Sequence, residues 1–233
     1  MPIPANALAI MAKAPVPGTV KTRLAPPLTL EQAADFYRAL LADQLEHLRS
    51  IANAERYLAY APDDAEVMMR ELGGNHYRYL VQRGADLGQR MNQIFVDLWH
   101  HGHRNAVVIG SDLPALPIDI FHQAFAQLDG AERRVVLGPS HDGGYYLIGM
   151  NQPAPGIFEN MTWGHDRVLA ETTARLNALG VSFSLLPKWF DLDTAEDLRR
   201  LRGEFDLVMR QSMPRTRACL EELSRLGFVE FST

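Results

Sequence analysis

The chain alternates between short runs that are apolar throughout and longer stretches in which apolar residues recur every three or four positions. The short runs predict buried strands, whereas the longer stretches predict amphipathic helices. The predicted strands cover about 7–12, 56–61, 77–82, 106–110, 135–137, 145–148 and 183–186. The predicted helices cover about 29–49, 63–72, 86–101, 117–128, 165–179, 195–203 and 214–226.

This alternation of strand and helix predicts a mainly parallel sheet with helices on both faces, which is a three-layer α/β fold. The run 106–110 is apolar throughout, as expected for a central parallel strand. No internal repeat or low-complexity linker divides the chain. We therefore predict one domain over residues 1–233, with residues 204–233 as a C-terminal helical appendage.

The composition argues against several classes of protein. The 233 residues include 23 basic and 28 acidic side chains, a net charge of −5, whereas nucleic-acid-binding proteins are typically basic. Cys219 is the only cysteine, which excludes an intramolecular disulfide and a cysteine-based zinc site and fits a reducing cytoplasm. Because no signal peptide is visible and no apolar run reaches about 18 residues, we predict a cytoplasmic protein without a membrane span. The C-terminal helix is a candidate surface for a homodimer.

A cluster of cations follows the first predicted strand. Only three of the 23 basic residues are lysines, and two of them, Lys13 and Lys21, lie in this loop with Gly18 and Arg23. Lysine and arginine on a stiff loop suit phosphate oxygens. Neither a Walker A loop nor a G-x-G-x-x-G motif is present. The loop is interpreted as a phosphate-binding element, with a solvated surface loop as the alternative.

Asp112 directly follows the central strand. Ligands of open α/β sheets bind at the carboxyl ends of the strands, and a carboxylate there can hold a divalent cation that bridges phosphate oxygens. The alternative is that Asp112 caps a turn, with Pro114 and Pro117 directing the chain into the next helix.

A second acidic segment lies near the C-terminal end of the predicted sheet. Thr194 and Asp197 form a capping-box pattern, which leaves Asp191 and Asp193 unassigned. In an extended segment these two side chains point the same way. If Asp193 meets Asp112 at about 4 Å, the carboxylates repel by roughly 4 kcal/mol at an effective dielectric near 20. A bound cation, or a proton on one carboxylate, would relieve this repulsion.

Three further segments carry polar or aromatic side chains beside glycine or a helix start. Asp142, Gly143, Gly144 and Tyr145 form a loop that could approach a ligand closely, or a tight turn between two strands. Trp163 and His165 precede a helix and could line an acceptor pocket or cap that helix. Asp86 and Gln89 form a capping box, although Asp86 is also a candidate ligand contact.

Four motifs together resemble the DUF2064 family. They are Met11–Leu24 (MAKAPVPGTVKTRL), Gly110–Pro114 (GSDLP), Leu137–Gly149 (LGPSHDGGYYLIG) and Asp191–Leu198 (DLDTAEDL). The resemblance spans about residues 7–201 in the right order. Family members are commonly labelled glycosyltransferases, some in arsenosugar biosynthesis contexts. They belong to the nucleotide-diphospho-sugar transferase superfamily with the GT-A fold, which also contains nucleotidyltransferases for the molybdenum cofactor and for phospholactate.

The resemblance implies a role for each motif. Lys21 stands at the place of the phosphate-contacting lysine, in a loop that binds the nucleotide with Lys13, Gly18 and Arg23. Asp112 stands at the position of the family's metal-binding aspartate, and Asp193 stands at a second acidic or amide position near the metal. Asp86 lies where the nucleoside is often contacted. The residues expected to face the acceptor are Asp142, Gly143, Gly144, Tyr145, Trp163 and His165.

These residues lead to one functional hypothesis with two alternatives. The hypothesis is a glycosyltransferase that uses Mg²⁺ or Mn²⁺ and a nucleotide-activated donor to modify a small-molecule acceptor. Lys21 would act on the donor phosphates, and Asp142 is the candidate base for the acceptor. The first alternative is a nucleotidyltransferase that joins an NTP to a phosphorylated acceptor and releases pyrophosphate. The second is a nucleotide-binding protein without catalysis.

Overall fold

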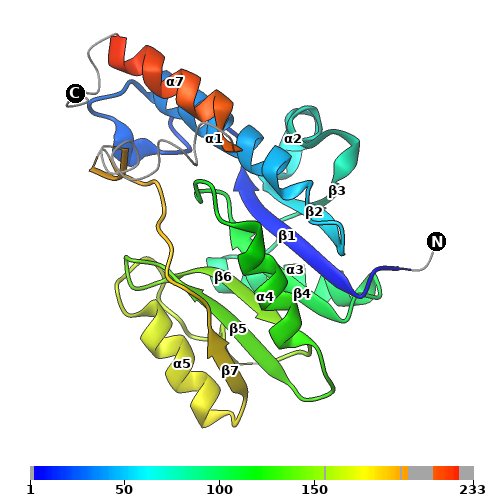
Figure 1. The fold of residues 1–233 in the computed structure, drawn as a ribbon. Helices are drawn as coiled ribbons and strands as arrows, with labels where there is room; N and C mark the ends of the chain where they lie inside the picture. The colour runs from blue at the N-terminus through cyan, green and yellow to red at the C-terminus, as the bar shows by residue number, and fades with distance from the viewer. Residues whose placement is uncertain (1–2, 155, 195, 199–211, 226–233) are drawn as a thin grey trace.

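A seven-stranded sheet forms the centre of the molecule (Figure 1), with the strand order β3-β2-β1-β4-β6-β5-β7. The computed structural model describes residues 3–154, 156–194, 196–198 and 212–225. The strands are β1 (Asn6–Lys13), β2 (Ala54–Ala61), β3 (Arg78–Val81), β4 (Asn105–Gly110), β5 (Arg134–Pro139), β6 (Tyr145–Met150) and β7 (Ser182–Leu185). Neighbouring strands are parallel except where β6 pairs with β4 and β5. The predicted α/β fold is confirmed.

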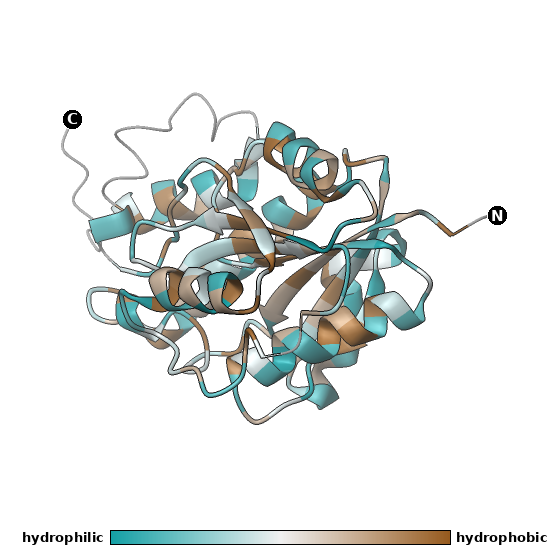
Figure 2. Ribbon diagram, turned by 90° about the horizontal axis from the view of Figure 1, so that it is seen from below, coloured by the Kyte–Doolittle hydropathy of each residue, from teal (hydrophilic) through white to brown (hydrophobic). Residues whose placement is uncertain are grey.

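Helices cover both faces of this sheet. The α-helices are α1 (Leu30–Leu48), α2 (Glu66–Gly73), α3 (Leu87–His100), α4 (Ile118–Leu128), α5 (Val168–Ala178) and α7 (Pro214–Arg225). The short 3-10 helices are η1 (Thr22–Leu24), η2 (Asp63–Ala65) and η3 (Gly74–His76). Figure 2 shows apolar residues gathered along the central strands and polar residues on the outer sides of the helices.

The alternation along β1 explains the three layers. Leu8, Ile10 and Ala12 are buried in a core shared with α1, α2 and α4. Ala7 and Ala9 point the other way, into a core shared with α3 and α5. Because successive side chains of a strand point to opposite faces, a strand that is apolar throughout requires helices on both sides.

A third apolar cluster connects α7 to the loops at one edge of the sheet. It contains Leu24 of η1, Leu192 and residues of α1 and α7. At the start of α7, the buried carboxylate of Asp43 on α1 accepts hydrogen bonds from the backbone nitrogen (2.7 Å) and hydroxyl (2.9 Å) of Thr216. Figure 1 shows α7 lying along α1. The cluster therefore anchors the segments around residues 22–24 and 190–192 to the same pair of helices.

The strand order creates a switch point beside β1. The chain leaves β1 towards β2 and β3 on one side and returns to β4 on the other side. The carboxyl ends of β1, β4, β5 and β7 lie at the same edge, because these strands are parallel and only β6 runs the other way. Ligands of open α/β sheets bind at this edge, next to such a switch point.

Several sequence predictions need correction or fall outside the described residues. Helix α5 begins at Val168 rather than at 165, and Pro117 is the N-cap of α4 rather than its first helical residue. The sheet, predicted to be mainly parallel, contains the antiparallel strand β6, in agreement with the predicted tight turn between β5 and β6. Of the predicted helix at 195–203, residues 195 and 199–203 lie outside the described part, as do 204–211 and 226–233 of the predicted appendage. Among the described residues, no helix combines the length and the apolar character needed to cross a bilayer.

Candidate functional site

A cleft of about 530 Å³ opens at the carboxyl edge of the sheet, between the loops that follow β1, β4, β5 and β7. The β1 loop contributes Lys13, Lys21 and Arg23, and the loop after β4 contributes Ser111 and Asp112. The remaining polar residues of its lining include Ser140, Asp142, His165, Asp191 and Asp193. The four loops that the sequence singles out therefore surround one cavity.

The ammonium of Lys21 joins the two predicted metal-binding aspartates. Its Nζ lies 2.5 Å from Oδ1 of Asp112 and 2.9 Å from Oδ1 of Asp193, and the lysine side chain is only 3% exposed. Burial lowers the pKa of Lys21, but the charges of Asp112 and Asp193 and their hydrogen bonds outweigh it and raise the pKa above the ordinary lysine value. The two carboxylates therefore converge on one cation, the ammonium of Lys21, which relieves the repulsion between them.

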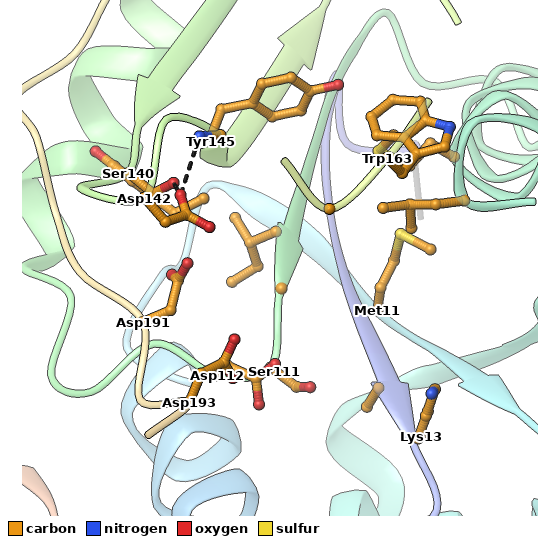
Figure 3. Close-up of a pocket in the computed structure, with 18 of the residues that line it drawn as sticks. Met11, Lys13, Ser111, Asp112, Ser140, Asp142, Tyr145, Trp163, Asp191 and Asp193 are labelled. Carbon is orange, nitrogen blue, oxygen red and sulfur yellow. Dashed lines mark hydrogen bonds between the residues drawn. The ribbon is translucent and has the colours of Figure 1, made fainter. Parts of the chain in front are cut away.

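Local packing brings Asp191 and Asp193 to the cleft. Leu192, between them, is fully buried in the third apolar cluster, and its backbone nitrogen donates to the carbonyl oxygen of Asp112 at 3.0 Å. The predicted capping box is present, because Asp197 accepts from the backbone nitrogen of Thr194 at 2.7 Å and Thr194 accepts from Asp197. With Leu192 turned inward, both neighbouring carboxylates line the cleft (Figure 3).

Negative charge dominates the side of the cleft formed by the loops after β5 and β7. Burial raises the pKa of Asp191 to about 7, and the charges of Asp142, Asp112 and Asp193 add to this, whereas Lys21 opposes it. In Figure 3 the carboxylates of Asp142 and Asp191 face each other. Burial, reinforced by these negative charges, therefore favours the protonated form of Asp191 more than in a free aspartate.

A hydrogen-bond network fixes the β1 and β4 loops to α1. The hydroxyl of Tyr37 accepts from the backbone nitrogen of Lys13 at 3.2 Å and shares a hydrogen bond of 2.7 Å with the hydroxyl of Ser111. Its ring centroid lies 5.9 Å from Nζ of Lys21. Gln82, after β3, donates to the carbonyl oxygens of Ala12 and Ala59 at 3.1 and 2.8 Å. Tyr37 and Gln82 were not predicted as site residues, because their helical and strand patterns carry no sign of which loop they contact. Ser111 belongs to the GSDLP motif, but no role was predicted for it.

The Asp142-Gly143-Gly144 loop connects β5 to the antiparallel β6, so the prediction of a turn between two strands is confirmed. The same loop also lines the cleft. Oδ1 of Asp142 accepts from the hydroxyl of Ser140 and from the backbone nitrogen of Gly144, the latter at 2.9 Å. Gly143 has a φ of +90° and lies so close to Asp166 that a Cβ would overlap its carbonyl oxygen. Gly144 lines the cleft directly, whereas Gly143 packs against the backbone of Asp166.

The opposite wall of the cleft is apolar and aromatic. Tyr145 and Trp163 line it together with Met11 of β1, as Figure 3 shows. Trp163 can pack on α3 because Gly88 has no side chain: a Cβ there would lie 2.8 Å from the indole ring. This wall suits an uncharged, flat or apolar group rather than a phosphate.

Most of the predicted site residues line the cleft, and three do not. Asp86 is the N-cap of α3, accepting from the backbone nitrogen of Gln89 at 2.8 Å, as its capping-box pattern predicts. Gly18 and Gly143 are not part of the lining either. Arg90, one helical turn after Asp86, lines the cleft and was missed by the sequence analysis. A role for Asp86 in nucleoside contact stays a prediction.

Two carboxylates of the cleft could bind a divalent cation, whereas a complete set of protein ligands is not seen among the described residues. Among the described residues, no group of three or more histidine, cysteine, aspartate or glutamate side chains is arranged around a common metal position. Two carboxylate oxygens, from Asp112 and Asp193, do converge on one cationic atom. Mg²⁺ is commonly held by one or two carboxylates, with substrate phosphates completing the coordination. The donor set therefore matches a cation that binds together with a phosphorylated ligand.

Comparison with known structures places the fold in one superfamily. A protein from Desulfovibrio desulfuricans G20, provisionally named a nucleotide-diphospho-sugar transferase, is 30% identical with a TM-score of 0.88, over 96% of this chain and 97% of that one. A cytidylyltransferase from Leptospira borgpetersenii serovar Hardjo-bovis (strain JB197) is 15% identical with a TM-score of 0.56, over 98% of both chains. CMP:2-keto-3-deoxy-manno-octonic acid synthetase, complexed with CTP, is 12% identical with a TM-score of 0.53, over 85% of this chain and 97% of that one. The chain therefore has a nucleotide-diphospho-sugar transferase-like fold.

The family is also identified from the sequence. The model of a family described as "Uncharacterized protein conserved in bacteria (DUF2064)" matches residues 44–165. A search of curated proteins gave no match. The chain belongs to the DUF2064 family, as the four motifs indicated.

Proposed function

We propose that the protein is a divalent-metal-dependent glycosyltransferase that moves a sugar from a nucleotide diphosphate to a hydroxyl of a small-molecule acceptor. The observation that carries the proposal is the meeting of Lys21, Asp112 and Asp193 at the switch point of the sheet. A buried ammonium and a pair of hard oxygen ligands, which a diphosphate and its cation would require, lie at the edge where ligands of open α/β sheets bind.

The residues of the β1 loop would hold the diphosphate. Lys21 offers a buried ammonium, whereas Lys13 and Arg23 line the outer part of the cleft and are exposed. Point charges and guanidinium forks of this kind bind phosphate oxygens. Because charge develops on the diphosphate as the sugar departs, cations already fixed around it lower the energy of the transition state more than that of the bound donor.

Mg²⁺ or Mn²⁺ would be held by Asp112 and Asp193. When bound, such an ion neutralises charge on the leaving diphosphate. Asp112 is well placed to orient it, because its loop is fixed by the hydrogen bond from Leu192 and by the Tyr37–Ser111 contact.

The negative side of the cleft favours a hydroxyl acceptor over a phosphorylated one. An acceptor phosphate in this part of the cleft would be repelled by the carboxylate of Asp142, whereas a neutral hydroxyl would not. Asp142 has one oxygen held by Ser140 and Gly144, which fixes the carboxylate in a position to accept a proton from such a hydroxyl. Sugar transfer is for this reason preferred over nucleotidyl transfer, which needs a phosphorylated acceptor.

The products distinguish the proposed reaction from its alternatives. Phosphorus NMR of mixtures that contain a nucleotide sugar, Mg²⁺ and small polyols is expected to show a nucleoside diphosphate. Parallel mixtures with an NTP and a sugar phosphate are expected to show no pyrophosphate. Release of pyrophosphate would contradict sugar transfer and support the nucleotidyltransferase alternative. Ligand binding without any product in either mixture would support a non-catalytic nucleotide-binding protein.

A further inference from the structure

Lys21 occupies the space between the two carboxylates that the proposed function assigns to the metal. Its Nζ lies 2.5 Å from Asp112 and 2.9 Å from Asp193 and is hydrogen-bonded to the latter. A divalent cation held by the same two Oδ1 atoms would require this space. The ammonium and the metal ion therefore exclude each other at this position.

The lysine backbone is fixed, but its side chain is long enough to move. Lys21 has a left-handed backbone conformation, with φ 48° and ψ 32°, and it directly precedes η1. The flanking residues Val20 and Leu24 are 6% and 0% exposed. Four rotatable bonds beyond this anchor allow the ammonium to change partners without unfolding the loop.

The charges in the cleft determine whether the Lys21 ammonium pairs with the two carboxylates or with a bound diphosphate. Without a ligand, the ammonium faces two carboxylates, and replacing it by a metal ion would leave two cations close together. Two cations close together in a partly buried site repel strongly, and the second charge of a divalent ion doubles this repulsion. A diphosphate in the cleft would attract the ammonium and release the carboxylates.

We propose that Lys21 is a displaceable counter-ion: it fills the divalent-cation position in the free protein and moves to the donor diphosphate when that ligand binds. This inference rests on the proposed function for the identity of the anionic ligand. Its consequence is positive coupling, in which the free protein binds the metal weakly and the anion and the metal favour each other's binding. Such coupling is reciprocal by thermodynamic necessity.

Titration with Mn²⁺ alone, followed by the EPR signal of the free ion, tests the first half of the inference. The variant Lys21→Met keeps most of the unbranched side chain and removes the ammonium and its charge. We expect it to bind Mn²⁺ roughly tenfold more tightly than the wild type, within the usual range of coupling effects. The gain should disappear in Lys21→Met/Asp112→Asn, because the ion would then lack one of its two carboxylates.

Lys13→Met is the matched control for long-range charge. Lys13 also lines the cleft and is exposed, so its removal changes the net charge equally without opening the space between the carboxylates. We expect it to leave Mn²⁺ binding close to that of the wild type. An equal gain in Lys13→Met, or no gain in Lys21→Met, would overturn the inference.

The wild-type protein offers a second test that does not depend on the folding of a variant. The chain has only three lysines, and Lys13 and Lys188 are exposed. Trace acetylation read by mass spectrometry should show low reactivity of Lys21 in the free protein and a severalfold increase when millimolar Mn²⁺ displaces it. Unchanged labelling of Lys21 would contradict the inference. Because neither test contains a nucleotide, failure here is distinguishable from failure of the proposed function.

Discussion

Replacing Asp112 by asparagine is expected to slow sugar transfer by about 10²–10³-fold, the loss typical of removing one fixed electrostatic group from a transition state. The variant keeps the shape of the side chain but has one anionic oxygen fewer for the metal ion. Asp112 is 40% exposed, and Lys21 retains Asp193 as a partner at 2.9 Å. Because Lys21 is buried but can still donate to an asparagine carbonyl, the free energy of unfolding is expected to fall by about 1–3 kcal/mol.

Initial rates of nucleoside diphosphate release and thermal unfolding of the same preparation would measure the two effects of Asp112→Asn. Asp119→Asn is the matched control, because Asp119 is an exposed carboxylate in the first turn of α4 and does not line the cleft. The control should keep the wild-type rate. A wild-type rate in Asp112→Asn would remove this carboxylate from the catalytic machinery.

Replacing Gly143 by alanine is expected to destabilise the protein by about 2–5 kcal/mol, the sum of a left-handed backbone penalty and the cost of overpacking. The φ of +90° disfavours any side chain, and the new Cβ would overlap the carbonyl oxygen of Asp166. This neighbour is backbone, so it cannot rotate away. The carbonyl oxygen of Gly143 also accepts from the backbone nitrogen of Leu169 at 2.9 Å, so a shift of the loop would disturb the start of α5.

Gly164→Ala separates the backbone penalty from the cost of overpacking. Gly164 has a similar φ of +82°, but a Cβ there would meet no atom within 4 Å. Its substitution should therefore cost only about 1–2 kcal/mol, from the backbone penalty alone. Urea unfolding of both variants gives the comparison. Equal losses of stability would show that the contact between Gly143 and Asp166 has no energetic weight.

The layers of the fold could be predicted because a strand that is apolar at every position must be covered on both faces. Along β1, every side chain from Ala7 to Ile10 is buried, and this requires helices on both faces. The apolar pattern of β6 does not indicate its direction, since an apolar strand pairs equally well in either direction. The five-residue connection between Pro139 and Tyr145 was the available indication, because it is too short for a crossover between parallel strands.

The candidate site could be predicted in part from the order of strands and loops along the chain. Residues that follow parallel strands meet at one edge, so Lys21, Asp112 and Asp193 could be expected in one place. The ion pairing among them could not be derived, because spacing in the chain does not fix the rotamer of a long lysine side chain. Tyr37 was overlooked because its place in a helical pattern indicates burial, whereas its hydroxyl contacts Ser111 at 2.7 Å.

The central claim is that the cleft binds a nucleotide-activated sugar in a metal-dependent way, and a thermal-shift panel tests it most directly. The panel would contain UDP-, GDP- and dTDP-sugars and NTPs, each with and without Mn²⁺. A ligand at about 100 times its Kd adds about 2.7 kcal/mol, or a shift of about 5–10 °C for a chain of this size. We predict such a shift with at least one nucleotide sugar, larger with Mn²⁺ and reduced in Asp112→Asn. No shift with any member of the panel would contradict the account.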